Sequence, residues 1–132
     1  MLVDQQQSAT ASPAKRVLVV EDEFVVAMDL SAELTDRGYT VVGPAATVEK
    51  ARALAGEGPL HGAVLDMSLA GSPVFEVARE LLSHNTPFLF ISGYSSPEIP
   101  SWMPPRLRYT KPLDAAQVVD AVDRLTENAV EA

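Results

Sequence analysis

Four short segments of the chain carry side chains that can do chemistry together. Three consecutive acids occupy positions 21–23, and the other segments contain Asp66, Ser92 and Lys111. Carboxylates held close together repel one another and raise one another's pKa. A divalent cation relieves that repulsion, and a set of oxygen ligands without nearby His or Cys favours Mg²⁺. The residue types therefore predict a magnesium site, provided that the fold brings these segments together.

A metal ion at this site would also allow phosphate to bind beside the carboxylates, because it offsets the repulsion between their negative charges. Asp66 can act as a nucleophile toward phosphorus and form an aspartyl phosphate. The Lys111 ammonium can neutralise the transferred group, and the Ser92 hydroxyl can donate a hydrogen bond to it. Each segment alone also has a structural interpretation, since acids stabilise helix N-termini and Asp or Ser-Gly suits turns. Only convergence of all four segments favours the chemical interpretation.

The elements that must position these residues follow from two alternating patterns. Short apolar or β-branched runs, typical of strands buried on both faces, alternate with stretches of helical spacing. The runs cover residues 17–20, 39–42, 63–65, 88–91 and 107–110. This alternation predicts an α/β fold, a doubly wound five-stranded parallel sheet of the flavodoxin-like order 2-1-3-4-5. In that order, the carboxyl ends of strands one, three, four and five surround one pocket, and strand two lies outside it.

Capping residues predict where the helices begin and end. Gly38 suits the C-terminus of the first helix, and Thr47 suits the N-cap of a second that runs to about residue 55. Ser72 is expected to cap a third helix with Pro73 in its first turn, and Asp114 to cap the last. Four prolines between residues 95 and 105 predict an irregular or shortened fourth helix. In that stretch, the pair at positions 102–103 either covers the sheet edge or contacts a partner protein.

Composition limits the class of protein. The chain has 132 residues, 10 basic and 18 acidic side chains, a formal charge of -8 and no cysteine. This length fits one domain, and the acidic balance argues against direct binding of nucleic acid or of an anionic membrane. Residues 1–14 are expected to be a disordered leader and residues 15–128 the folded domain. Without a signal peptide or a membrane span, the cytoplasm is the expected compartment.

Residues 16–128 resemble the receiver domain of two-component response regulators. The resemblance rests on VLVVEDE (17–23), AVLDMSL (63–69), FISGY (90–94) and TKPL (110–113), in that order along the chain. The third motif resembles the Phe-x-Thr/Ser-Gly-Tyr signature of a subgroup often found as stand-alone domains in bacteria. Here the usual proline and glycine after the phosphoacceptor are replaced by residues 70–73.

The resemblance implies a role for each site residue. Asp66 would be the phosphoacceptor, Asp22 would bind Mg²⁺ directly and Glu21 mainly through water. The backbone carbonyl of Ser68 would be a further metal ligand, with Asp66 itself in the coordination set. Ser92 would be the switch hydroxyl.

Lys111 would be the lysine that pairs with phosphate, and its bond to Pro112 is expected to be cis. The aromatic that usually lies three residues before this lysine is replaced by Arg108. Tyr109, one position later, should point to the other face of the sheet. In the subgroup, Tyr94 is the candidate for the aromatic that moves on phosphorylation.

The function implied is a phosphorylatable signalling domain and not an enzyme in the usual sense. Its donor would be the phosphohistidine of a sensor histidine kinase or of a histidine phosphotransfer protein. Its output would be altered contact with a downstream protein. The main alternative is an interaction module that keeps the fold without phosphorylation. A flavin or nucleotide binder fits less well, because the loop after strand one offers acids where phosphate-binding amides are needed. A phosphatase with an acid nucleophile after strand one also matches poorly.

Overall fold

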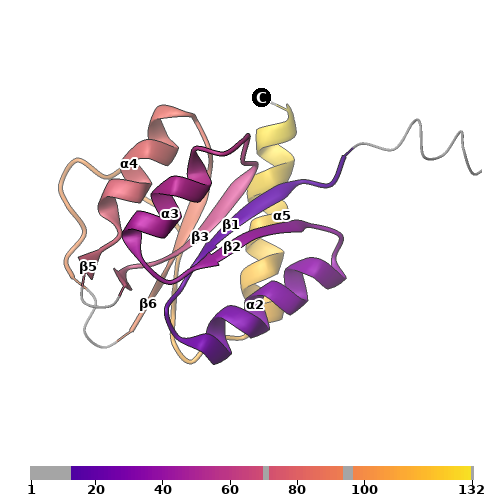
Figure 1. Cartoon of the computed structure of the whole chain (residues 1–132), viewed down its shortest axis with the longest axis horizontal. Helices are drawn as coiled ribbons and strands as arrows, with labels where there is room; N and C mark the ends of the chain where they lie inside the picture. The colour runs from indigo at the N-terminus through magenta and orange to yellow at the C-terminus, as the bar shows by residue number, and fades with distance from the viewer. Residues whose placement is uncertain (1–12, 70–71, 94–96, 132) are drawn as a thin grey trace, which may run out of the picture.

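A central parallel sheet carries helices on both of its faces (Figure 1). The computed structural model describes residues 13–69, 72–93 and 97–131. The expected disordered leader therefore lies mostly outside the described residues. The strands of the main sheet are β1 (Arg16–Val20), β2 (Thr40–Ala45), β3 (Gly62–Asp66), β6 (Phe88–Ser92) and β7 (Arg108–Thr110).

The sheet has the predicted topology. Its order is β2-β1-β3-β6-β7, and every neighbouring pair is parallel. Numbered among the five main strands alone, this is the order 2-1-3-4-5. The flavodoxin-like α/β prediction is confirmed.

Four helices cover the sheet. They are α2 (Phe24–Asp36), α3 (Val48–Ala55), α4 (Phe75–Ser83) and α5 (Ala115–Glu131). Two of the predicted caps are confirmed: Thr47 accepts a hydrogen bond from the Lys50 amide at 3.1 Å, and Asp114 Oδ1 accepts one from the Ala116 amide at 3.0 Å. Two apolar layers lie between the sheet and these helices, one against α3 and α4 and the other against α2 and α5.

Both apolar layers use the central strands. Leu18 and Val20 of β1 face the layer of α3 and α4, and Val17 and Val19 face the layer of α2 and α5. Side chains alternate between faces along a strand. Because both faces are buried, the strand sequence shows a continuous apolar run and no polar alternation.

The predicted start of the third helix is wrong. Ser72 and Pro73 form the short strand β5 (Ser72–Pro73), which pairs antiparallel with β4 (Ser68–Leu69). Helix α4 begins only at Phe75, with Val74 at its N-cap and no side-chain capping bond there among the described residues. Leu69 and Val74 are both buried in the core. Burial of these two side chains outweighs the local preference of Ser-Pro for a helix start.

Strand β2 also runs further than its sequence suggests. It continues through a cis Gly43–Pro44 bond to Ala45, and its register against β1 shifts between Leu18 and Val20. Gly43 has a φ of +105°, and a Cβ there would lie 2.9 Å from the Val19 carbonyl oxygen. Only glycine fits both the backbone conformation and the close approach to β1.

The segment between β6 and β7 contains no α-helix in its described part, residue 93 and residues 97–107. This confirms the prediction from its prolines, as far as the described residues go. Met103 is buried in the layer of α3 and α4, whereas Trp102 is 42% exposed. The Arg79 guanidinium lies 4.5 Å from the centroid of the Trp102 ring. The segment is therefore anchored on α4 by one buried side chain and one stacked ring.

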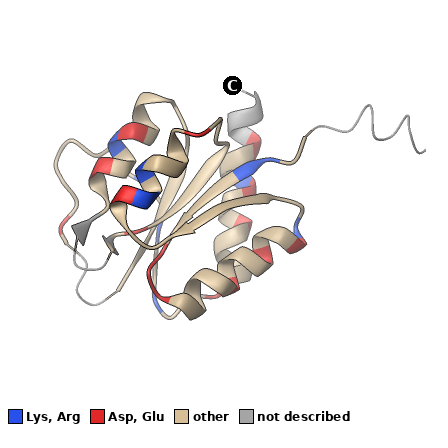
Figure 2. Cartoon of the chain, in the orientation of Figure 1, with Lys and Arg blue, Asp and Glu red and all other residues tan. Residues whose placement is uncertain are grey.

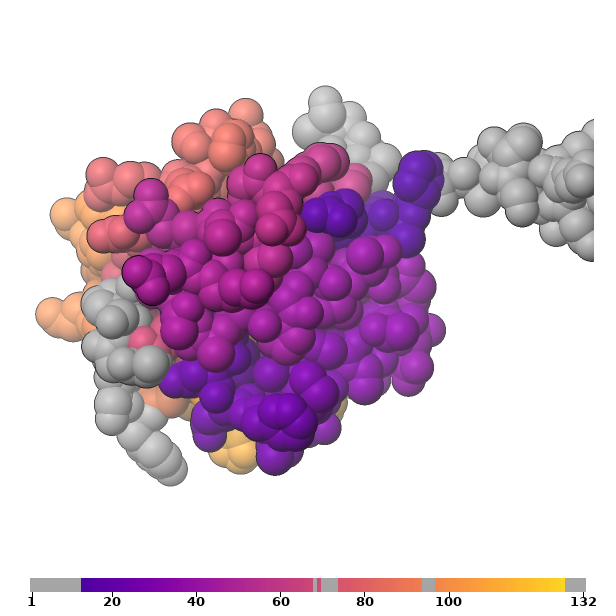
Figure 3. Space-filling model, viewed as in Figure 1, coloured from indigo at the N-terminus to yellow at the C-terminus, as the bar shows by residue number. Residues whose placement is uncertain are grey.

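Figure 3 shows α3 and α4 side by side on one face of the molecule, with the residues after β6 next to α4. Arg52, Arg79 and Trp102 line a hollow on this face. Among the helices that the structure describes, none combines the length and the apolar character that crossing a membrane requires.

Candidate functional site

The candidate site lies at the carboxyl ends of four strands. Glu21 directly follows β1, Asp66 ends β3, Ser92 ends β6 and Lys111 directly follows β7. Two backbone hydrogen bonds hold these strand ends in register: the Met67 amide donates to the Ile91 carbonyl, and the Lys111 amide to the Ser92 carbonyl, each at 2.9 Å. Strand β2, at the far edge, contributes no reactive group, as predicted.

Three carboxylates meet at this end of the sheet. One oxygen from each of Glu21, Asp22 and Asp66 can be chosen so that all lie within 4.8 Å of one another. Glu21 and Asp66 are each only 2% exposed, whereas Asp22 faces solvent. In Figure 2 the acids of the segment between β1 and α2 are visible as a red stretch. An all-oxygen set with two buried members and one open member suits a hard divalent cation that keeps water ligands.

Glu21 is a buried carboxyl beside a second buried acid, Asp66. Burial raises its pKa to about 7, and the neighbouring Asp66 adds to the shift. The Glu23 amide and Lys111 oppose it by donating hydrogen bonds to Glu21 Oε2 at 2.9 and 3.1 Å. Glu21 Oε1 is buried and accepts no hydrogen bond from any described residue, although Lys111 Nζ lies 3.1 Å away. A buried carboxylate oxygen that accepts no hydrogen bond is a fitting ligand for a metal ion.

Lys111 connects the acids. Its Nζ lies 3.4 Å from Asp66 Oδ2 and also pairs with Glu21 and with Glu23. Burial opposes the charged form of Lys111, but the bonds to Glu23 and Glu21 and the charge of Asp66 together raise its pKa. The lysine is therefore a permanent cation beside Asp66, where it can meet an anionic group.

The remaining predicted residues are placed as follows. Ser92 is buried at the end of β6, next to the strand that leads to Lys111. Ser68 lies in β4, two residues after Asp66, and the role of its carbonyl stays a prediction. The Lys111–Pro112 bond is cis, as expected.

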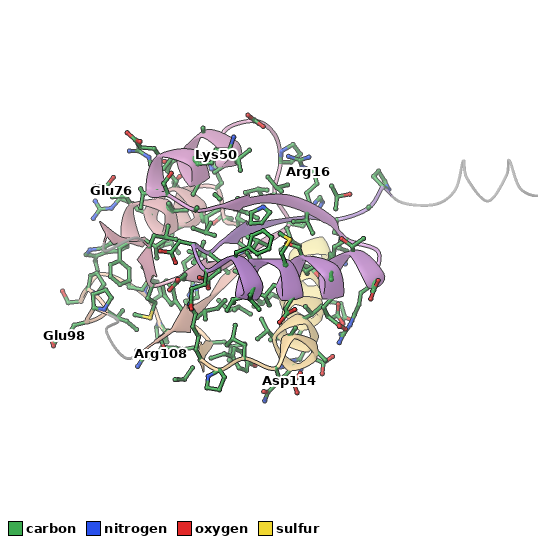
Figure 4. The ribbon with its side chains drawn as sticks, turned by 60° about the horizontal axis from the view of Figure 1, so that its bottom comes forward. Arg16, Lys50, Glu76, Glu98, Arg108 and Asp114 are labelled. Atoms are coloured by element: carbon green, nitrogen blue, oxygen red, sulfur yellow. The ribbon has the colours of Figure 1, made fainter. Side chains whose placement is uncertain are left out.

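Two tyrosines are candidates for the moving aromatic. Tyr109 is half-buried against the layer of α2 and α5. Arg108 is exposed (Figure 4), and its partner in β6, Phe90, faces the layer of α3 and α4. This confirms that the ring at position 109 lies on the other face of the sheet. Tyr94 lies outside the described residues, so its role stays a prediction.

Glu23 makes the contact that the sequence does not reveal. The sequence places it among the three consecutive acids, with helix capping as its structural interpretation. It does occupy the N-cap position of α2, but its side chain makes no capping bond within the described part of the chain. It pairs with Lys111 instead. A third acid directly after an acid pair is the only signal, and its partner depends on the path of the chain after β7.

Comparison with known proteins finds similar chains and similar folds. No family model matches the chain. The chain is 34% identical over 122 residues to the phyllosphere-induced regulator PhyR of Methylorubrum extorquens, across 89% of this chain and 46% of that protein. It thus spans about half the length of the curated relatives it matches.

Two solved structures are similar over nearly their whole length. SdrG from Sphingomonas melonis is 33% identical, and the match covers 87% of this chain and 98% of that one with a TM-score of 0.75. A response regulator receiver protein from Sinorhizobium medicae is 28% identical, with coverage of 88% and 97% and a TM-score of 0.69.

Proposed function

Because this chain belongs to the receiver domains of response regulators, we propose that it is a phosphorylatable switch in a two-component or phosphorelay pathway. Asp66 is the proposed acceptor of the phosphoryl group. The observation that carries this proposal is the buried Asp66 carboxylate, grouped with Glu21 and Asp22 and lying 3.4 Å from Lys111 Nζ. These are the groups that phosphoryl transfer to a carboxylate requires, in one pocket.

The proposed reaction moves one phosphoryl group. A carboxylate oxygen of Asp66 forms a bond to phosphorus while the bond from phosphorus to the donor's histidine nitrogen breaks. The leaving imidazole keeps the electron pair of that bond. Lys111 neutralises the charge that the phosphoryl oxygens bring into the pocket. The Ser92 hydroxyl donates a hydrogen bond to one of these oxygens. The domain is altered by the reaction it assists, so it acts as a signalling protein and not as a turnover enzyme.

A divalent cation fits the same pocket. Glu21, Asp22 and Asp66 are the proposed Mg²⁺ ligands, with the Ser68 carbonyl as a further one. The buried Glu21 Oε1, without a hydrogen bond from any described residue, supports this assignment. When bound, the ion would offset the repulsion between the carboxylates and the incoming phosphoryl oxygens.

The proposed donor is a protein, a sensor histidine kinase or a histidine phosphotransfer protein. Phe24 and Val25 are 75% and 69% exposed, and they directly follow the acids of the site. Large apolar side chains in such an exposed position support docking of a partner beside Asp66.

We place this exchange in the bacterial cytoplasm, with a downstream protein as the target. The formal charge of -8 supports an output by protein contact without direct binding of nucleic acid.

Two narrower assignments belong to this proposal. FISGY at 90–94 favours the stand-alone subgroup with the Phe-x-Thr/Ser-Gly-Tyr signature. A phosphorylation-independent interaction module is the second candidate function, favoured by the exposed Trp102 ring on the surface of α4.

Intact mass after incubation with acetyl phosphate tests the proposal and separates the two candidates. We expect a gain of one phosphoryl group with Mg²⁺ and none with a chelator. Asp66→Asn should abolish the gain, whereas Asp29→Asn, which removes an exposed acid of α2, should retain it. Undiminished labelling of Asp66→Asn would refute the site. Absence of labelling in the unmodified chain under every condition would favour the interaction module.

A further inference from the structure

The ammonium group of Lys111 is fully engaged before any phosphate arrives. A lysine ammonium has three hydrogen-bond donors. Three carboxylates meet it here: Glu21, Glu23 and Asp66. A phosphoryl group on Asp66 would bring additional anionic oxygens to the same ammonium, and these would compete with the present partners for its three donors.

The three partners differ in how firmly they are held. The side chains of Glu21 and Asp66 are 0% and 3% exposed, whereas that of Glu23 is 60% exposed. Glu21 is also fixed by the hydrogen bond from the Glu23 amide. Asp66 is the last residue of a central strand, and its carboxylate is the group that would carry the phosphate.

Glu23 is the partner that can leave at least cost. Its side chain makes no capping bond to α2 within the described residues, so its departure breaks no helix contact that the structure contains. Its carboxylate can be rehydrated at once because it lies at the surface.

We propose that Glu23 is a positioning residue that holds Lys111 in the unphosphorylated protein and is displaced from it by the phosphoryl group on Asp66. This inference rests on the proposed function. Glu23 and the phosphoryl group compete for the same donor, so the carboxylate lowers the apparent affinity of the pocket for phosphoryl groups. No covalent bond is made or broken at Glu23 itself.

Beryllofluoride with Mg²⁺ tests the competition, because it forms a non-transferable mimic of an aspartyl phosphate. Its dissociation constant would be measured by titration calorimetry on the whole chain. Glu23→Gln removes the competing charge and should tighten binding by roughly three- to tenfold, the range expected for one partly exposed ion pair. Asp29→Asn removes an equal charge from the exposed face of α2 and should leave the affinity unchanged.

Acetyl phosphate gives a second measurement. In Glu23→Gln the concentration that half-saturates labelling should fall by the same factor, while the maximal rate stays near that of the unmodified chain. If Glu23 had only a structural role, its substitution would not lower the half-saturating concentration while leaving the maximal rate unchanged.

A spectroscopic readout reports on the contact itself. The chain has three lysines, so side-chain ¹⁵N signals of lysine can be assigned by single substitutions. Beryllofluoride should shift the Lys111 signal in the unmodified chain, and Glu23→Gln alone should shift it before any ligand is added. Asp29→Asn should leave the Lys111 signal of the ligand-free protein where it is in the unmodified chain.

The outcomes separate the two levels of the proposal. If the unmodified chain binds no beryllofluoride and takes no phosphoryl group, the proposed function fails. If it binds beryllofluoride but Glu23→Gln leaves the affinity unchanged or weakens it, only the role of Glu23 fails. An equal gain in Asp29→Asn would also overturn that role, because it would show a general effect of charge and no competition at Lys111.

Discussion

Adjacent acids of the pocket experience different surroundings. Glu21 is buried beside Asp66, whereas Asp22 is open to solvent. Burial raises the pKa of Glu21 to about 7, from an ordinary value of 4.5. Without a metal, the folded chain therefore holds a proton at Glu21 between these pH values, and the unfolded chain does not.

This difference predicts how stability depends on pH. Because the folded state binds the extra proton, the free energy of unfolding should fall as pH rises from about 4.5 to above 7, and the full effect is about 3 kcal/mol. Glu21→Gln should remove this decrease and be the more stable protein at pH 8. Urea unfolding in the presence of a chelator, at steps of pH, measures both.

Asp22→Asn is the matched control, because it removes the neighbouring exposed acid. It should keep the decrease in stability that the unmodified chain shows. A flat pH profile in the unmodified chain would contradict the assignment of a raised pKa to Glu21.

The site was predictable from the sequence where residue type and strand position agree. Asp66 and Lys111 each end or follow an apolar run, and parallel strands bring such ends together. The pairing of Glu23 with Lys111 was not predictable in this way. It depends on where the loop after β7 places one flexible side chain, and no periodic pattern encodes that position.

At the scale of elements, the join between β1 and β2 supports the first acids. Gly43 has a φ of +105°, and a Cβ there would approach the Val19 carbonyl of β1 to 2.9 Å. Val19 lies two residues before Glu21. The backbone of β1 just before the site therefore packs closely against Gly43, a position that tolerates no side chain.

Substitution of this glycine should be costly. Gly43→Ala is expected to lower the free energy of unfolding by about 3 kcal/mol or more, because it combines a disfavoured φ with a steric clash against β1. Gly38→Ala is the matched control: Gly38 has a φ of +90°, but apart from Gly38 and its two chain neighbours no described residue has an atom within 4 Å of the place that an alanine Cβ would occupy. It should cost about 1 kcal/mol. Equal losses in chemical denaturation would show that the approach to β1 is unimportant.

Elements were predicted best where local pattern and tertiary burial agree. The strands were found because burial on both faces leaves continuous apolar runs, and α3 and α5 because Thr47 and Asp114 do cap them. The start of α4 was missed because Leu69 and Val74 are drawn into the core. Their burial favours the β4–β5 pair. The local preference of Ser72 and Pro73 for a helix start does not predict this tertiary effect.

At the scale of the whole molecule, occupancy of the pocket should stabilise the fold. A ligand that binds only the folded state adds about 2.7 kcal/mol when its free concentration is a hundred times its dissociation constant. Mg²⁺ with beryllofluoride should therefore raise the melting temperature, and chelation should reverse the rise. Asp66→Asn should show no rise with beryllofluoride. A rise of equal size in that variant would show binding elsewhere on the molecule.

The ring of Trp102 lies between solvent and the guanidinium of Arg79, on the segment that joins β6 to β7. It is the only tryptophan in the chain. Indole emission depends on the polarity around the ring, so its wavelength records how this segment rests on α4. The same segment leads from Ser92 toward Lys111. The protein thus contains its own optical probe on the segment that connects Ser92 to Lys111 along the chain, readable without any attached dye.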